Sequence, residues 1–300
     1  MSEKSPSIAL ASAPTFTSSG LSPRTSFAKL FLRERLGVVG AVIVLCLVVG
    51  AAVGPLLAPN APDALVGQRL MDPGTSGFIL GTDATGRDEL SRILNGFRQT
   101  VLVAGLASVI SVVLAVTIGL LSGWSAGRWP DVVVQRFVDA AMSFPPLVTL
   151  IVVAAIVGAG IAQLVVTLGV LTSIAASRVV RSAVLSVKDR DYVMAARACG
   201  APTYRLILKH VLPNVAAPII VIATLNLGNI VLVEASLSFL GLGITDPALP
   251  TWGRMLFDAR SVLQKAPFLA VWPGVMISLT VFAFNMLGDA LRDVLDPRLR

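Results

Sequence analysis

The sequence predicts an all-α integral membrane protein with six transmembrane helices. Of its 300 residues, 55% are hydrophobic and 14% are charged, and the mean hydropathy is +0.82. Because soluble domains carry about 25% charged residues, this composition excludes an ordinary soluble protein. The net charge is +7, which we attribute to cytoplasmic loops rich in Lys and Arg. The chain is therefore expected to lie in a lipid bilayer and to have no nucleic-acid partner.

The N-terminal part of the chain divides by composition. Residues 1–25 are rich in Ser, Pro, Ala and Thr and lack apolar periodicity, which is typical of disordered segments. The next apolar run starts too late and is too long for a signal-peptide core, so we expect it to remain as a span. The predicted parts are a disordered cytoplasmic tail with a basic flank (1–35), a first transmembrane helix plus an outer loop with an interfacial helix (36–98), and a core of five transmembrane helices that includes the loop 188–213 (99–300).

Six apolar runs approach the roughly 20 residues that a membrane-spanning helix needs. Pro145 and Pro146 lie inside the third run and should kink it or mark its start. With both termini inside, the cytoplasmic segments hold 17 Lys and Arg residues and the outer segments hold 7, as the positive-inside rule requires. The predicted spans are residues 36–58, 99–123, 137–158, 161–184, 214–236 and 268–289.

The outer loop after the first span ends in the segment "LGTDATGRDELSRILNGFRQT". Glycine and aspartate at positions 81–86 indicate turns, and Asp88 and Glu89 suit the first turn of a helix. The apolar residues that follow at helical spacing are Leu90, Ile93, Leu94 and Phe97. With Arg92 on the polar side, this pattern predicts a helix that lies on the outer membrane face and leads into the second span. The alternative is an ordinary amphipathic connector.

Three polar side chains, Asn226, Asn229 and Glu234, fall inside the fifth predicted span. A charge inside a membrane costs at least ~2.5 kcal/mol unless protein or water shields it. Asn226 and Glu234 are two turns apart and should roughly share a face, with Asn229 offset. Two interpretations remain open, a polar translocation path and an interhelical hydrogen bond near the outer end. Arg178 and Arg181, at the inner end of the fourth span, are expected to snorkel to the lipid headgroups.

The stretch "AARACGAPTYRLILKHVLPN" separates the fourth and fifth spans. Asp189 or Asp191 can cap a helix that Gly200 ends, and Pro202 suits the start of a second short helix. The first helix carries a stripe of mostly small residues, and one face of the second helix is apolar. These two sets are Tyr192, Ala195, Ala196 and Cys199, then Tyr204, Ile207, Leu208 and Val211. Small side chains let another surface approach closely, so the loop is either a docking element or a structured connector.

The segments "MAARACG" and "HVLP" within this stretch resemble the EAA loop of ABC importer permeases. The positions that match at the family spacing are Ala195, Ala196, Gly200, Leu212 and Pro213. Met194 replaces the family glutamate and His210 takes a position that is otherwise apolar. Both departures are similar to what the peptide-importer branch shows.

A second motif, "GTDATGRDELSR", resembles the signature that follows the first span in C-type permease subunits of dipeptide and oligopeptide importers. Its residues are Gly81, Thr82, Asp83, Gly86, Arg87, Asp88, Ser91 and Arg92. The segments "EASLSFLGLG" and "NMLGDALRDVLDPRLR" resemble the same branch. The four motifs occur in family order, and nickel importers share the pattern.

The resemblance implies a type I ABC importer permease fold with cytoplasmic coupling helices. It implies a multi-pass subunit of a bacterial plasma (inner) membrane with both termini cytoplasmic, which translocates short peptides. The implied partners are a homologous B-type permease, two ATP-binding subunits and an extracellular substrate-binding protein. The residues implied to dock on the ATP-binding subunits are Tyr192, Ala195, Ala196, Cys199, Gly200, Ala201, Pro202, Leu212 and Pro213.

The sequence agrees with a transporter subunit that leaves the chemistry to its partners. A phosphate-binding P-loop needs Gly-Lys before Ser or Thr, and none of the five lysines follows a glycine. We therefore expect no catalytic residue and no cofactor on this chain, with ATP and Mg²⁺ bound in the partner subunits. The lone His210 and the two cysteines form no cluster that indicates a metal site.

Two other classes of protein were weighed. An ion-coupled secondary transporter would use Glu234 as an ion site, but such proteins typically show internal halves with paired broken helices. An intramembrane serine hydrolase needs a base beside its nucleophile, and the sole histidine, His210, lies outside the predicted spans. A nickel importer of the same ABC branch is the alternative for the substrate.

Overall fold

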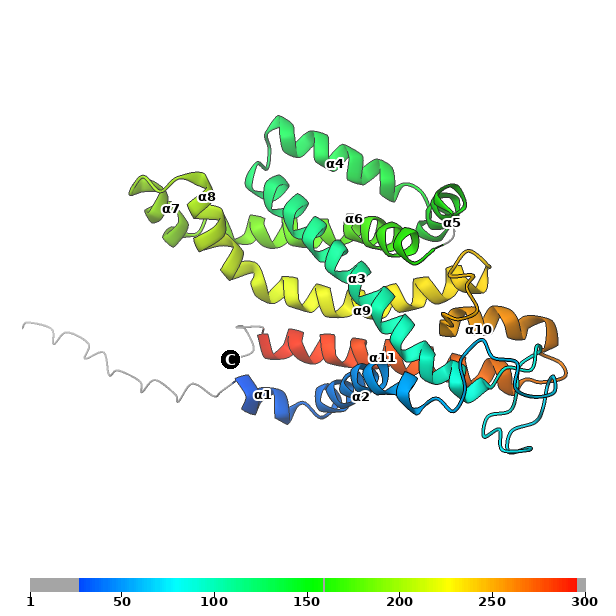
Figure 1. The fold of residues 1–300 in the computed structure, drawn as a ribbon. Coiled ribbons are helices and arrows are strands. Elements are labelled where there is room, and N and C mark those ends of the chain that lie inside the picture. Colours follow the sequence, from blue (N-terminus) through cyan, green and yellow to red (C-terminus); the bar gives the residue numbers. More distant parts are fainter. Residues whose placement is uncertain (1–26, 159, 296–300) are drawn as a thin grey trace, which may run out of the picture.

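The computed structural model describes residues 27–158 and 160–295, which form helices joined by loops (Figure 1). The α-helices are α1 (Phe27–Arg33), α2 (Arg35–Leu57), α3 (Glu89–Trp124), α4 (Trp129–Met142), α5 (Pro146–Val157), α6 (Ile161–Val187), α7 (Asp191–Ala198), α8 (Thr203–Arg205), α9 (Ala216–Phe239), α10 (Trp252–Ala259) and α11 (Phe268–Leu295). A π-helix (Leu206–Val211) and a 3₁₀ segment (Leu212–Val215) join α8 to α9, and a second 3₁₀ segment (Arg260–Val262) follows α10.

Five helices within the described residues are long and apolar enough to cross a membrane: α2, α3, α6, α11 and the continuous helix Thr203–Phe239. These five confirm five of the predicted spans. The other predicted span is the pair α4 and α5, which is bent by 90°. Pro145 is extended at ψ 126°, and Pro146 is the first residue of α5. Proline lacks an N–H and has a fixed φ, so it starts a helix more readily than it continues one.

The predicted N-terminal tail is corrected where the structure describes it. Residues 1–26 lie outside the described residues. Phe27–Arg33 forms α1, which packs against α2 and α11. Apolar residues at helical spacing in "FAKLFLR" account for this helix. The basic flank is therefore helical on both sides of Glu34, although it was predicted to belong to the N-terminal tail 1–35.

The interfacial helix predicted before the second span is also corrected. α3 is a single helix of 36 residues, and it continues unbroken across the predicted boundary between residues 98 and 99. Asp88 caps it, as its carboxylate accepts a hydrogen bond from the Ser91 N–H at 3.3 Å. Gly96 lies within this helix, and a Cβ there would come within 2.5 Å of the Trp252 indole nitrogen. Glycine therefore permits the close contact between α3 and Trp252 of α10. The start of α3 is thus packed against α10 and is continuous with the span, so it is not a separate helix.

The two ends of the molecule differ in what they carry. Figure 1 shows α1, α7, α8 and the C-terminal end of α11 at one end, and α10 with the loop between α2 and α3 at the other.

α3 and α6 make the most extensive helix pair. A Cβ on Gly119 would lie 2.6 Å from the Cβ of Val180, and one on Gly123 would lie 2.7 Å from that of Val184. Glycine therefore permits the close approach of these two helices.

Candidate functional site

The loop between α6 and α9 presents an exposed helix. α7 has one fully buried side chain, Val193, which anchors the helix. Ala196 is half-buried, and the other stripe residues are exposed; they are Tyr192, Ala195 and Cys199. The Arg197 guanidinium stacks on the Trp124 ring at 5.3 Å and ties α7 to the end of α3. The small-residue stripe therefore remains open at the end of the molecule.

The turn after α7 is formed as the sequence predicts. Gly200 has a φ of +80°, and no atom lies within 4 Å of the position that a Cβ would occupy. The left-handed conformation, and not crowding, is therefore what favours glycine here. Neither predicted cap is formed, because the N-cap residue is Arg190 and it makes no side-chain capping bond. The other predicted loop residues, Ala201, Pro202, Leu212 and Pro213, lie in the turn and at the start of the 3₁₀ segment.

The second short helix predicted in this loop is longer than expected. α8 continues through the π-helix and the 3₁₀ segment into α9, so that one distorted helix runs from Thr203 to Phe239. Leu206 and Val211 are buried, whereas Tyr204 and Leu208 are exposed, contrary to the predicted stripe. A π-helix joins residues i and i+5 by hydrogen bonds, and this widened turn brings Leu206 and Val211 to one side.

A buried ionic cluster lies near this loop, and the sequence analysis missed it. Arg181 of α6 donates two hydrogen bonds to Asp131 of α4, at 2.9 and 2.8 Å. Asp131 also accepts from Ser122 of α3 and from the Gly127 N–H. At the exposed edge of the cluster, Arg178 of α6 pairs with Asp139, which also lies on α4. Both arginines are thus paired with carboxylates of α4, and they fasten α4 to α3 and α6.

Two of the three polar residues in the fifth span line a cavity of about 480 Å³ between the α4–α5 elbow, α6 and α9. Asn229 is exposed, and Asn226 donates a hydrogen bond to Ser111 of α3 at 2.8 Å. Most of the other lining side chains are apolar, with Thr149 and Thr172 as exceptions. The structure therefore brings the two asparagines to the same cavity.

Glu234 lies elsewhere on α9, in the seam beneath α10. It is 2% exposed, and its carboxyl group accepts a hydrogen bond from Ser238 at 2.7 Å and also interacts with Thr251. The predicted pairing of Asn226 with Glu234 on one face is wrong. Eight residues rotate a helix by about 80° beyond two full turns, whereas three residues fall about 60° short of one turn. Asn229 is therefore the nearer neighbour of Asn226 in helical angle.

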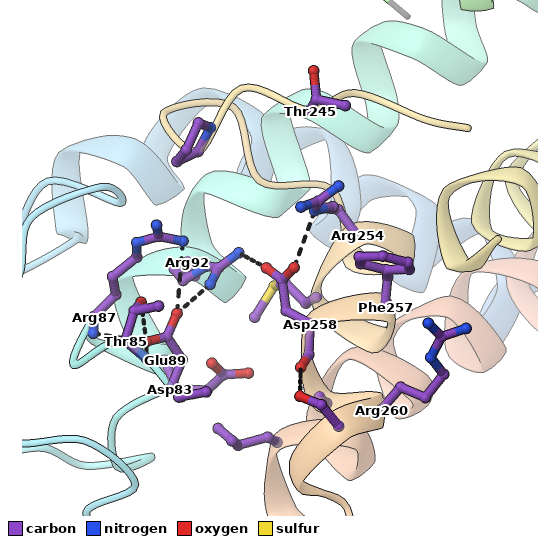
Figure 2. Close-up of a pocket in the computed structure, with 16 residues that line it drawn as sticks. Asp83, Thr85, Arg87, Glu89, Arg92, Thr245, Arg254, Phe257, Asp258 and Arg260 are labelled. Atoms are coloured by element: carbon purple, nitrogen blue, oxygen red, sulfur yellow. Dashed lines mark hydrogen bonds and ion pairs between the residues drawn. The ribbon is translucent and has the colours of Figure 1, made fainter. Parts of the chain in front are cut away.

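The outer-loop signature folds around the carboxylate of Asp83. One oxygen accepts hydrogen bonds from the Thr85 N–H and hydroxyl, both at 2.7 Å, and from the Arg87 N–H at 2.9 Å. The other oxygen pairs with Arg92, whose second terminal nitrogen donates to Asp258 of α10 at 2.8 Å (Figure 2). Arg92 is 1% exposed. It therefore joins the loop before α3 to α10, a contact that its predicted place on the polar side of the helix did not reveal.

The remaining signature residues shape the turns around this ion pair. Gly81 and Gly86 have φ values of +80° and +94°, and a Cβ on either would lie within 2.5 Å of a backbone oxygen. The Thr82 hydroxyl bridges two backbone groups of the preceding loop. Asp88 accepts a second hydrogen bond from the Ser91 hydroxyl at 2.6 Å. This network makes the end of the molecule that carries α10 a folded platform (Figure 1).

Comparison with known proteins gives matches over most of the chain. Residues 115–300 match the family described as binding-protein-dependent transport system inner membrane component, and residues 22–73 match the N-terminal TM domain of oligopeptide transport permease C. The dipeptide transport system permease protein DppC of Alkalihalophilus pseudofirmus is 37% identical over 93% of this chain and 91% of its own length. The glutathione transport system permease protein GsiD of Pectobacterium atrosepticum is 39% identical over 93% and 92%.

A solved structure agrees with the architecture. A chain of the MetNI methionine ABC transporter, in an inward-facing conformation, matches with a TM-score of 0.57 and 20% identity. The match covers 68% of this chain and 97% of that chain. At this identity the likeness concerns the fold alone.

Proposed function

This chain belongs to the family of binding-protein-dependent transport system inner membrane components, and we propose that it lines half of a path for short peptides across the bacterial plasma membrane. The family is that of permease components of ABC importers, and not of their ATPase subunits. Relatives named for dipeptides, di- and tripeptides and glutathione support a short peptide as the substrate class.

The continuous helix Thr203–Phe239 is the observation that carries this proposal. It starts at the exposed loop that carries Gly200 and passes the cavity lined by Asn226 and Asn229. A force applied to the loop by an ATP-binding subunit would therefore reach the wall of the cavity through one helix that no loop interrupts. This arrangement supports the loop as the coupling element and the cavity as part of the translocation path.

The proposed assembly contains this chain, a homologous B-type permease, two ATP-binding subunits that hold ATP and Mg²⁺, and an extracellular substrate-binding protein. Large apolar side chains on α4 and α5 are exposed, and these helices border the cavity. That surface supports a second permease as the cover of the open side. The exposed stripe on α7 supports the docking of an ATP-binding subunit.

Both chain termini and α7 are proposed to be cytoplasmic. The described ends of the chain lie at the same end of the molecule as α7 (Figure 1). The loops assigned to that side carry the majority of the Lys and Arg residues, in line with the positive-inside rule.

The test is uptake of a labelled dipeptide and a labelled tripeptide into proteoliposomes that contain the complete importer. Uptake should require ATP and the binding protein, and it should survive a proton and sodium ionophore. Asn229→Leu should lower uptake per ATP hydrolysed, and Asn95→Leu, outside the cavity, should not. Loss of uptake with the ionophore at full ATP would overturn the proposal in favour of ion coupling.

A further inference from the structure

A pocket of about 400 Å³ opens at the outer end of the molecule, between the loop before α3 and α10. Arg92 and Glu89 are almost fully buried at its wall, with exposed fractions of 1% and 2%. Arg87, Arg254 and Arg260 also line it, and Figure 2 shows these side chains around the pocket. The pocket shares no lining residue with the proposed coupling loop or with the cavity lined by Asn226 and Asn229.

The pocket lining contains more arginines than acidic residues. The lining holds four arginines and three carboxylates, those of Asp83, Glu89 and Asp258. Asp83 and Asp258 are each engaged by Arg92, and Asp258 also accepts from Arg254 at 3.0 Å. Arg260 makes no ion pair among the described residues.

Arg260 and Arg254 contact the same aromatic ring. Both guanidinium groups lie on the ring of Phe257, at 5.0 and 4.7 Å from the ring centre. Arg254 is already paired with Asp258, whereas an incoming anion would give Arg260 an ionic partner. Arg260 is exposed and forms the accessible side of the pair.

Buried donors at the pocket wall lack acceptors. The Nε atoms of Arg87 and Arg92 are buried and have no hydrogen-bond partner within the described residues. A buried donor without an acceptor costs about 1–3 kcal/mol. The Oε1 atom of Glu89 is likewise buried and has no hydrogen-bond partner among the described residues. The pocket is therefore incomplete in hydrogen bonding as well as in charge.

We propose that this pocket receives an acidic side chain, Asp or Glu, from the extracellular binding protein when it docks on the outer platform. The inference rests on the proposed function, because it assumes an importer with such a partner. The carboxyl groups of Asp83, Glu89 and Asp258 in the lining disfavour a free, multiply charged anion, whereas the surplus of arginines favours a single carboxylate. A side chain fixed on a docked protein is held by the rest of the interface, so this small surplus suffices to orient it.

The experiment measures the affinity of the binding protein for the complete importer in nanodiscs at low and high salt. Arg260→Glu should weaken binding about tenfold at low salt, and Arg260→Gln should weaken it less. Lys265→Glu is the matched control, because Lys265 is an exposed cation near the same helix outside the pocket. It should change affinity by less than about twofold. Reversal of one acidic residue of the binding protein to Arg should restore binding to Arg260→Glu.

Equal weakening by Arg260→Glu and Lys265→Glu would overturn the inference, since the effect would then be general attraction between surfaces. Unchanged affinity in Arg260→Glu, or the absence of any rescuing acidic residue, would overturn it as well. Wild-type uptake, measured separately, distinguishes the two proposals. An importer that transports peptides but fails the charge-reversal test leaves the proposed function intact and removes only the docking site.

Discussion

Arg92 joins two parts of the chain that are far apart in sequence. Its guanidinium pairs with Asp83 before α3 and with Asp258 of α10, 166 residues later. Burial of these charges is costly, so the arrangement depends on all three partners. The residue thereby fixes the position of α10 against the N-terminal end of α3.

Replacement of Arg92 by Met should destabilise the protein by roughly 3–5 kcal/mol, because it leaves the buried Asp83 carboxylate with only Arg87, at 3.8 Å, as an ionic partner. The measurement is the apparent Tm of the purified importer in detergent. Arg98→Met is the control, since Arg98 lies on the same helix and is exposed. A Tm for Arg92→Met equal to that of the control would show that the ion pairs contribute little.

The pH dependence of Asp83 offers a second test. Burial raises the pKa of the Asp83 carboxyl, but hydrogen bonds from Arg87 and Thr85 and the charge of Arg92 outweigh burial and lower it. A depressed pKa stabilises the fold above the ordinary value of about 3.9 and ceases to do so as the pH falls through the folded-state value. The Tm difference between wild type and Asp83→Asn should therefore be constant from about pH 7 to pH 5 and shrink below about pH 4. A difference that shrinks already above pH 5 would contradict this assignment.

For Glu234 the prediction concerns hydrogen bonding. Because the carboxyl group accepts from Ser238 in a sealed seam, Glu234→Gln should retain more transport than Glu234→Ala. The amide keeps an acceptor, whereas alanine leaves polar partners unsatisfied. The measurement is peptide uptake at equal amounts of assembled importer. Complete loss of uptake in Glu234→Gln with normal assembly would show that the charge itself is required.

At the scale of elements, α7 and the turn after it form the unit that we expect to contact an ATP-binding subunit. Ala196→Trp should separate the docking surfaces, with an overpacking cost of about 1–3 kcal/mol. Gly200→Val should distort the turn, because the left-handed conformation costs roughly 1–2 kcal/mol without glycine. Both changes should reduce recovery of the ATP-binding subunits in a pull-down or uncouple ATP hydrolysis from uptake.

The matched control for the loop is Arg205→Ala, which removes an exposed side chain of α8. It should change neither the pull-down nor the uptake per ATP by more than about twofold. Normal pull-down and normal uptake per ATP in both Ala196→Trp and Gly200→Val would show that the loop is only a connector. Pairing with the second permease should persist in all three variants, since the spans are unaltered.

At the scale of the whole molecule, the proposed orientation predicts from which side of the membrane each loop can be labelled. Cys199 is naturally exposed on the loop after α7, and Ala248 is exposed at the opposite end. In a Cys46→Ser background, Cys199 should react with a membrane-impermeant maleimide only from the cytoplasmic side. In a Cys46→Ser, Cys199→Ser background, Ala248→Cys should react only from outside. Labelling of Cys199 in intact cells would reverse the proposed orientation.

The sequence by itself determined those features that depend on neighbouring residues. The five long spans follow from runs of apolar residues, the break before α5 from Pro145 and Pro146, and the left-handed turn from Gly200. Backbone conformation and hydrophobic periodicity act within a few turns of helix, so they are visible in a short window. The family resemblance rests on motifs of the same short length.

Only the tertiary structure decided which distant groups meet. The pairs Arg92–Asp258, Arg181–Asp131 and Asn226–Ser111 join residues 166, 50 and 115 positions apart. No local pattern encodes such partners, because they depend on the relative rotation and depth of packed helices. The same reason explains why the start of α3 was expected at a surface. The sequence around Arg92 does not reveal that Asp258 of α10 pairs with it in a buried site.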